Sequence, residues 1–262
     1  VYKRQALRPA VVVDVKHLPG MREIQFTPDG GLHVGAAVTM NQLARHPDVH
    51  TYYPILSQAA ESVASYQVRN RATLGGNLCN ASPCADTSPA ALVLQAWLHL
   101  FGPNGKRTIT ADAFFQGPGL TALRPSELLT TIRFPPPWTL SAGHYLKLGR
   151  CRSGDLALVG VAVLGFQDGT VPHRPSTSEP NFVFRIGLGS VAPTPLRAIE
   201  AEAFLAAHPP GEEGFAQAAT RAMEMARPIS DVRGSAGYQK AMVRALTLRG
   251  LRKVWAQLKE AE

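Results

Sequence analysis

Three consecutive prolines, Pro135 to Pro137, divide this chain of 262 residues into two parts. Proline has no backbone N–H and a fixed φ, so a run of three can neither pair in the middle of a sheet nor continue a helix. Helical and strand-like segments mix before the run, and strands followed by helices come after it. We therefore expect one domain over residues 1–137 and a second over residues 138–262.

The first half mixes strands with helices. The apolar run Val11–Val15 predicts a short buried strand. An alternating segment interrupted by Asp29, Gly30 and Gly31 predicts a hairpin. The other elements expected in this half are helices over 39–43, over 55–65 and from residue 89 onward, strands over 97–101 and 127–134, and a loop over 114–119.

The second half reads as a small antiparallel sheet followed by helices. The strands expected are Gly143–Leu148, Leu156–Gly165 and Phe182–Leu188. A polar, turn-rich loop is expected over residues 168–181. The expected helices span 196–207, 214–225 and 236–259.

The formal net charge of +8 gathers near the C-terminus. From Arg221 onward there are nine Lys or Arg against four Asp or Glu. The aromatic residues there, Tyr238 and Trp255, do not form the stacking ladder of a single-stranded nucleic-acid binder. We therefore expect no nucleic-acid binding and interpret the basic tail as a face that docks another subunit.

Segment composition also limits where the protein works. No apolar run reaches the 18 residues that predict a membrane span. The first 15 residues lack the pattern of a secretory signal peptide, which predicts a cytoplasmic protein. Three cysteines are too few and too odd in number for a disulfide framework.

The segment from Arg69 to Ala90 carries the densest chemistry. Gly75 and Gly76 allow a ligand to approach the backbone, and successive exposed N–H groups beside them would form an anion nest. Side-chain donors flank the glycines at Thr73, Asn77, Asn80 and Ser82. Asp86 stands before a helix, where it could cap that helix or bind a ligand hydroxyl. A phosphate cradle and a plain glycine turn with a helix cap are about equally supported by these residues.

Cysteines in the same segment do not predict a metal site. Cys79 and Cys84 supply half of a tetrahedral zinc site and half of the ligands of an iron–sulfur cluster. Cys151 is distant in sequence, and the eight histidines are scattered. We interpret the thiols as small buried apolar groups.

Two further patterns were open to more than one interpretation. Gly187–Ala192 fits Gly-x-Gly-x-x-Ala, but Pro193 and Pro195 prevent the helix that a dinucleotide-binding turn requires. Lys147 lies in an alternating strand that begins at Tyr145, which is also typical of an ordinary solvated basic strand end. No nucleophile elbow or HExxH pattern indicates a hydrolase.

Five segments, in order, resemble the flavoprotein subunits of molybdenum hydroxylases, which include the medium subunits of carbon monoxide dehydrogenase-like enzymes and the flavin domain of xanthine dehydrogenase. They are RNRATLGGNLCNASPCADTSPA, RTITADAFFQGPGLTALRPSELLTTIRFPPP, YLKLGRCRSGDLALVGVAV, IGLGSVAPTPLRAIEAE and PISDVRGSAGYQKAMVRAL. The resemblance implies an α+β fold: an FAD-binding domain of the PCMH (vanillyl-alcohol-oxidase-like) type, then a small domain of a three-stranded antiparallel sheet with helices.

Carried over by position, the resemblance assigns roles to eight residues. It implies that Thr73, Gly75, Gly76 and Asn77 hold the FAD pyrophosphate region, and that Asn80 and Asp86 bond the ribityl or phosphate portion. It further implies that Leu129 packs near the isoalloxazine, and that Lys147 lies at the polar edge of the ring, where a positive charge would favour the reduced anion.

The chain departs from the family in two places. An earlier phosphate loop of the type Ala-Gly-Gly-Thr-Asp-Leu is absent, so we expect that about fifty residues precede Val1 in the native protein. The cysteine-rich insert of the benzoyl-CoA-reductase-like branch is also absent after Cys79, which indicates that the chain binds no iron–sulfur cluster of its own.

The resemblance implies an FAD-binding electron-transfer subunit. Electrons would come from the [2Fe–2S] clusters of one partner and leave through the flavin, while a large partner subunit would hold the molybdenum cofactor; together they would form a heterotrimer. Two alternatives stay open. One is a stand-alone FAD oxidoreductase of the same fold, and the other is a flavin-free scaffold that only docks partners.

Overall fold

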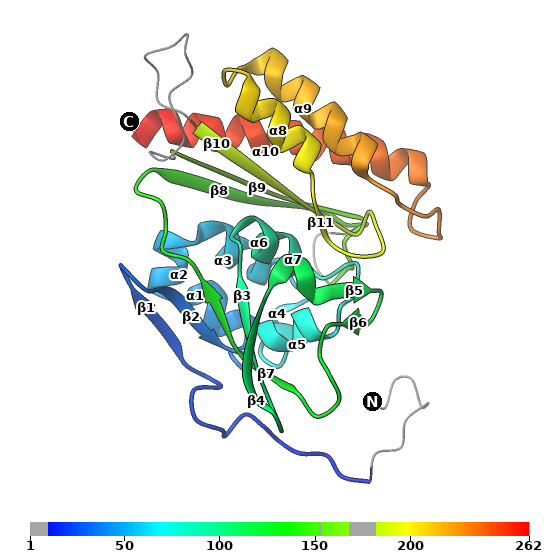
Figure 1. Ribbon diagram of the computed structural model, residues 1–262. Helices are drawn as coiled ribbons and strands as arrows, with labels where there is room; N and C mark the ends of the chain where they lie inside the picture. Colours follow the sequence, from blue (N-terminus) through cyan, green and yellow to red (C-terminus); the bar gives the residue numbers. More distant parts are fainter. Residues whose placement is uncertain (1–9, 152–153, 168–181, 262) are drawn as a thin grey trace.

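The computed structural model describes residues 10–151, 154–167 and 182–261. Its lower half in Figure 1 contains a five-stranded antiparallel sheet in the order β1-β2-β7-β3-β4. These strands are β1 (Ile24–Thr27), β2 (Gly31–Gly35), β7 (Leu128–Phe134), β3 (Trp97–Gly102) and β4 (Gly105–Thr110). The predicted hairpin is confirmed, with Ile24 opposite Val34 and Thr27 opposite Gly31.

Six short helices lie beside this sheet, and local sequence explains where they begin. Thr39 and Gln42 form a capping box at the first helix, and Pro47 and Pro54 begin the next two, where a missing N–H costs nothing. The six are α1 (Met40–Arg45), α2 (Pro47–Tyr52), α3 (Pro54–Glu61), α4 (Tyr66–Arg69), α5 (Leu74–Cys79) and α6 (Thr87–Val93).

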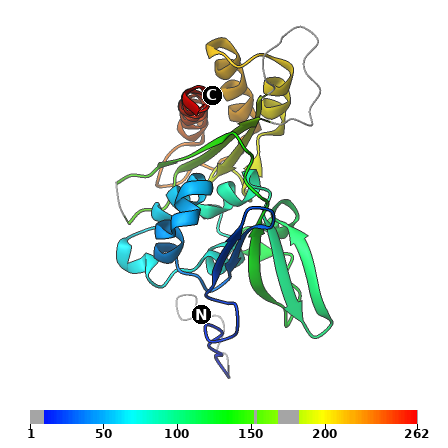
Figure 2. The ribbon, with the colours of Figure 1, turned by 90° about the vertical axis from the view of Figure 1, so that its left-hand side faces the viewer.

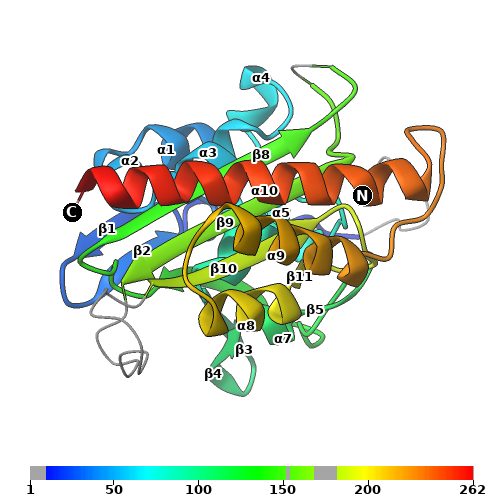
Figure 3. The same cartoon turned by 90° about the horizontal axis from the view of Figure 1, so that it is seen from above.

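A second sheet lies above the first half, in the order β11-β10-β9-β8. Its strands are β8 (Ser141–Leu148), β9 (Val159–Gln167), β10 (Phe182–Gly189) and the two-residue β11 (Leu196–Arg197). The three long strands are the predicted ones, and β11 adds a short edge. Three helices cover the outer face: α8 (Ile199–Ala207), α9 (Glu212–Met225) and α10 (Ala236–Ala261), with α10 crossing the sheet (Figure 3).

Both faces of this second sheet are buried. Side chains alternate along a strand, and Ala162 and Leu164 of β9 belong to the core of the first half, whereas Val161 and Val163 belong to the core under α8–α10. The sheet therefore stands as a middle layer, with α3 and α6 on one side and the C-terminal helices on the other (Figure 2). This double burial explains the nearly unbroken apolar sequence of β9.

Gly187 allows β10 to approach α6 closely. A Cβ placed there would lie 2.6 Å from the carbonyl oxygen of Pro89 and 3.1 Å from Val93 Cγ1. A backbone atom cannot move aside as a flexible side chain can. The glycine thus sets the distance between the second sheet and the helix that follows the glycine-rich segment.

We expect Gly187→Ala to destabilise the protein by about 2 kcal/mol, because the added methyl group overpacks this contact. The measurement is urea unfolding followed by circular dichroism. Gly237→Ala is the matched control, since a Cβ at Gly237 meets nothing within 4 Å, and a helical Ala is favoured over Gly. Equal stabilities of the two variants would contradict the close approach.

Some of the sequence expectations differ from the structure, and one concerns residues that the structure does not describe. The Val11–Val15 strand is wrong: Val11, Val12 and Val13 are 74–76% exposed, no strand of the described chain pairs with them, and of the run only Val15 packs against the core. The expected loop over 114–119 is partly regular secondary structure, because α7 (Ala111–Phe114) leads into a hairpin of β5 (Phe115–Gly117) and β6 (Leu120–Thr121). The polar loop expected over 168–181 lies outside the described residues.

Candidate functional site

Thr73 begins α5, the helix that contains the two adjacent glycines. Its hydroxyl accepts a hydrogen bond from the Gly76 amide at 3.0 Å. The other early amides of the helix are occupied too, since Leu74 donates to Val38 O, Gly75 to Ala36 O and Asn77 to Thr73 O. The anion nest expected from successive exposed N–H groups is therefore wrong for these four amides: the helix start uses them to join α5 to the chain after β2.

The two glycines have different surroundings. A Cβ on Gly75 would lie 2.6 Å from Ala36 Cβ and from its carbonyl oxygen, so Gly75 is needed for packing. A Cβ on Gly76 would meet only Thr73 Oγ1, at 2.9 Å. The remaining space beside Gly76 is open, which leaves its backbone accessible to a ligand.

Asp86 precedes α6 but makes no capping hydrogen bond. Its side chain instead points to the second sheet, where Tyr145 Oη donates to Oδ1 at 2.9 Å and Lys147 Nζ donates to Oδ2 at 2.9 Å. The carboxylate is only 6% exposed. An acid of the first half is thus paired with a lysine of the second, and the capping role foreseen for Asp86 is wrong.

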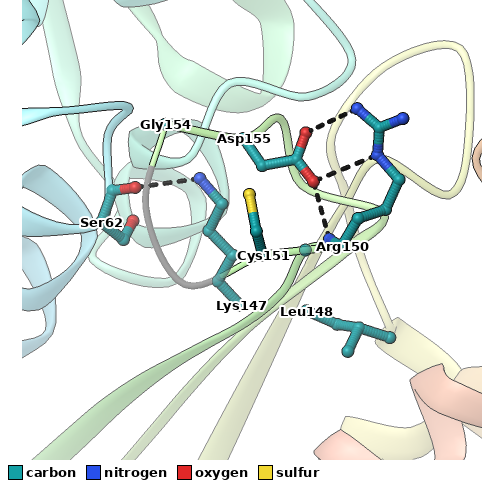
Figure 4. Close-up of a pocket in the computed structure, with 8 residues that line it drawn as sticks. Ser62, Lys147, Leu148, Arg150, Cys151, Gly154 and Asp155 are labelled. Atoms are coloured by element: carbon teal, nitrogen blue, oxygen red, sulfur yellow. Dashed lines mark hydrogen bonds and ion pairs between the residues drawn. The ribbon is translucent and has the colours of Figure 1, made fainter.

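Lys147 also donates to the carbonyl oxygen of Ser62 at 2.9 Å, which fixes its ammonium group between two acceptors. Beside it lies a pocket of about 430 Å³ at the C-terminal end of β8, shown in Figure 4. An ion pair between Arg150 and Asp155 borders the pocket, with Nη2 and Oδ1 3.1 Å apart. The pocket therefore has a polar wall in which the charges are paired.

Burial and the ion pair act on Asp86 in opposite directions. Removal from water raises the pKa of Asp86, and the neighbouring Lys147 and Tyr145 lower it without cancelling the effect of burial. The pKa of Tyr145 is raised by burial and by the Asp86 charge. Tyr145 therefore stays a protonated hydrogen-bond donor, while Lys147 favours the ionised form of Asp86 against the effect of burial.

The other sequence-predicted residues divide into two groups. Asn77 is linked indirectly to Asp86, Tyr145 and Lys147, because Thr87, the residue after Asp86, donates to Asn77 Oδ1 at 2.5 Å. Asn80 ends α5 close by in the chain. Leu129 lies elsewhere, buried in the five-stranded sheet opposite Leu100.

Tyr145, Ser62 and Thr87 were not among the residues expected from the sequence. A signal for Tyr145 existed: it stands two positions before Lys147 in an alternating strand, and residues i and i+2 share one face of a strand. Ser62 contributes only a backbone carbonyl, which no side-chain pattern predicts.

The cysteines are thiols in the described structure. Burial raises the pKa of Cys79 to about 11, which fits the interpretation of a buried apolar group. Cys84 instead accepts a hydrogen bond from Arg233 Nη1 at 3.1 Å. Within the described ranges, no three His, Cys, Asp or Glu side chains come together as metal ligands.

Comparison with known families covers both halves. Residues 1–137 match the family described as the FAD binding domain in molybdopterin dehydrogenase, and residues 144–254 match the CO dehydrogenase flavoprotein C-terminal domain. The chain belongs to the FAD-binding subunits of the molybdopterin dehydrogenases. As a member of this family it is a flavoprotein subunit of a molybdenum-containing oxidoreductase, with the fold implied by the resemblance and FAD as its cofactor.

Individual relatives agree with this membership. The carbon monoxide dehydrogenase medium chain of Hydrogenophaga pseudoflava is 34% identical over 97% of this chain and 85% of its own. A putative xanthine dehydrogenase FAD-binding subunit of Escherichia coli is 30% identical over 90% of this chain and 78% of its own. The structure of quinoline 2-oxidoreductase from Pseudomonas putida superposes with a TM-score of 0.85 at 30% identity, covering 96% of this chain and 84% of that one.

The residues of this flavoprotein subunit fit its cofactor. FAD presents hydroxyls, phosphates and a polar ring edge. These groups are bound by hydrogen-bond donors and by a cation whose charge is partly balanced by an acid, and they do not need a set of metal ligands. The site offers the open side of Gly76, the side-chain amides of Asn77 and Asn80, and the Lys147 ammonium. The buried hydroxyl of Ser88 in α6 also has no hydrogen-bond partner among the described residues.

None of the described helices is long and apolar enough to cross a membrane.

Proposed function

We propose that this subunit carries electrons within a three-subunit molybdenum hydroxylase, from the [2Fe–2S] clusters of one partner through FAD to an external acceptor. A large partner subunit would hold the molybdenum cofactor and oxidise the substrate. The observation that carries the proposal is the Asp86–Lys147 ion pair, which joins the loop of the FAD-binding half to the second sheet beside a pocket. Relatives named as medium chains and FAD-binding subunits support it.

In this proposal the domain division at the triple proline stands: residues 1–137 form the FAD-binding domain and residues 138–262 the C-terminal flavoprotein domain. The family matches over 1–137 and 144–254 support it. The two domains build the site together, since Asp86 comes from the first, and Tyr145 and Lys147 come from the second.

Eight residues are proposed to hold FAD. Thr73, Gly75, Gly76 and Asn77 hold the pyrophosphate region: Gly76 through its open side, Asn77 through its side-chain amide, and Thr73 and Gly75 by shaping α5. Asn80 and Asp86 bond the ribityl or phosphate portion, Leu129 provides apolar packing near the ring, and Lys147 lies at the polar edge of the ring.

The chemistry that FAD supplies is the exchange of one or two electrons, which lets a one-electron iron–sulfur partner serve a two-electron acceptor. The chain's residues bind and tune it. Asp86 and the Ser62 carbonyl hold the Lys147 ammonium in one place, and Tyr145 keeps its proton and orients Asp86. The negative charge of Asp86 partly balances the positive charge of Lys147, so the site does not present an unpaired cation to the flavin.

The decisive experiment is to express the full-length protein together with the subunits encoded beside it. We expect a heterotrimer that contains FAD, iron–sulfur clusters and molybdenum, and a flavin that is bleached when the substrate of the large subunit is added. A protein that binds FAD and turns over a small substrate without partners would support the stand-alone oxidoreductase instead. A protein that takes up no FAD would support the third interpretation, a flavin-free scaffold that only docks partners. Cell fractionation would test the cytoplasmic location that we propose.

A further inference from the structure

The loop between Asn80 and Asp86 is held mainly from outside. Within it, Ala85 N donates to Ser82 O and Cys84 N to Ser82 Oγ. Ala81 has a positive φ of 44°, which a non-glycine residue adopts at some cost. Three segments distant in sequence contact it. Gly119 N donates a hydrogen bond to Ala81 O at 2.9 Å, and Ser190 N donates one to Pro83 O at 2.7 Å. Arg233 Nη1 donates to Cys84 Sγ at 3.1 Å.

Two of these contacts come from the C-terminal domain, and Arg233 makes the one that uses a charged side chain. Arg233 and Cys84 are 149 residues apart in the chain. Cys84 stands two residues before Asp86, the acid that pairs with Lys147. Arg233 therefore lies where it can hold the loop between Asn80 and Asp86 in place from the other domain.

Arg233 is itself held in a fixed orientation. Its Nε and Nη2 donate to Asp231 Oδ2 at 2.9 and 2.6 Å, and its backbone N–H donates to Asp231 Oδ1 at 2.8 Å. The buried Gln239 of α10 fixes the same loop by donating to the carbonyl oxygens of Ile229 and Gly234. The fork of the guanidinium thus leaves Nη1 aimed at the sulfur.

We propose that Arg233 is a positioning residue for the cofactor: through Cys84 it holds the loop over residues 80–86, and with it Asp86, in the arrangement that retains FAD. This inference rests on the FAD site proposed above. A thiol is a weak acceptor, so the contact orients the loop rather than adding much stability. A lysine could keep the charge at this position but not the fork that binds Asp231 and Cys84 together.

The test measures the release of FAD from the full-length protein, as the rise in free-flavin fluorescence after dilution. We expect Arg233→Met and Cys84→Ala each to accelerate release about tenfold, the size of one modest hydrogen bond. The double variant should be no faster than Arg233→Met alone, because the bond to Cys84 is already absent there. Cys84→Ser should release FAD nearly as slowly as wild type, since a hydroxyl oxygen still accepts the bond.

Arg252→Met is the matched control, because Arg252 also pairs with an acid, Glu212, but on the outer side of α9 and α10. It should leave the release rate unchanged. A purely structural Arg233 would lower the unfolding midpoint of the FAD-free protein without changing FAD release, and that result would overturn the inference. Additive effects of the Arg233 and Cys84 variants would overturn it as well. Wild-type protein that never retains FAD would overturn the proposed function and this inference together.

Discussion

Lys147→Met is expected to lower the free energy of unfolding at pH 7 by about 3 kcal/mol, because it leaves the Asp86 carboxylate buried without its cation. The pair is well shielded, with side-chain exposures of 15% for Lys147 and 6% for Asp86. Urea unfolding of the FAD-free protein measures the loss without a contribution from cofactor binding.

This loss should depend on pH in a defined direction. The folded pKa of Asp86 lies above its ordinary value of 3.8. An aspartate with a raised folded pKa favours folding most below its ordinary pKa, and that contribution is lost as pH rises through the folded pKa. Removing Lys147 raises the folded pKa further. The deficit of Lys147→Met relative to wild type should therefore be smallest near pH 4 and grow toward pH 7.

Two variants make this prediction specific. Asp86→Asn combined with Lys147→Met should recover part of the lost stability at pH 7, because no buried charge is left alone. Arg252→Met breaks an exposed ion pair and should have little effect. A deficit in Lys147→Met that is as small as that of Arg252→Met, or that does not vary with pH, would show that Asp86 is not held ionised by Lys147.

Gly76→Val is expected to weaken FAD binding about 100-fold, equal to about 2.7 kcal/mol. Its Cβ would meet only the hydroxyl oxygen of Thr73, at 2.9 Å, and its methyl groups would enter the open space beside α5. Ligand approach to the backbone should thus suffer more than the fold does. Equilibrium titration of the full-length protein with FAD measures the affinity.

Gly237→Val is the control for this variant, since it makes the same change in a helix where a Cβ meets nothing within 4 Å. It should bind FAD like wild type. Gly75→Ala should lower the thermal stability, which Gly76→Val changes less, because the added methyl group meets Ala36. A folded Gly76→Val protein with wild-type affinity would remove Gly76 from the cofactor site.

Much of the fold follows from local patterns. The hairpin around Gly30 and Gly31, the capped helix after Thr39 and the three long strands of the second sheet each carry their own signal of alternation, turn or cap. The Val11–Val15 run failed for a physical reason. An apolar run indicates that burial would be favourable, but it cannot say whether a partner strand is present to pair with it.

The site was less predictable than the fold. The segment around Gly75 and Gly76 drew attention by composition, yet the amides expected to form a nest are occupied by Ala36, Val38 and Thr73. The pairing of Asp86 with Lys147 spans 61 residues and joins the loop before α6 to strand β8. Only the resemblance connected these two residues, and it did so by assigning both to one cofactor rather than to each other.

The double burial of the second sheet has a consequence for how the protein unfolds. The wall of β8, β9 and β10 belongs to two hydrophobic cores at once, so removing either domain would expose apolar surface that the other now covers. Two regions that share a wall of this kind are coupled, and a single cooperative transition is the natural outcome. The triple proline thus marks a division of the sequence that thermodynamics does not follow: heat or urea should melt both domains as one unit.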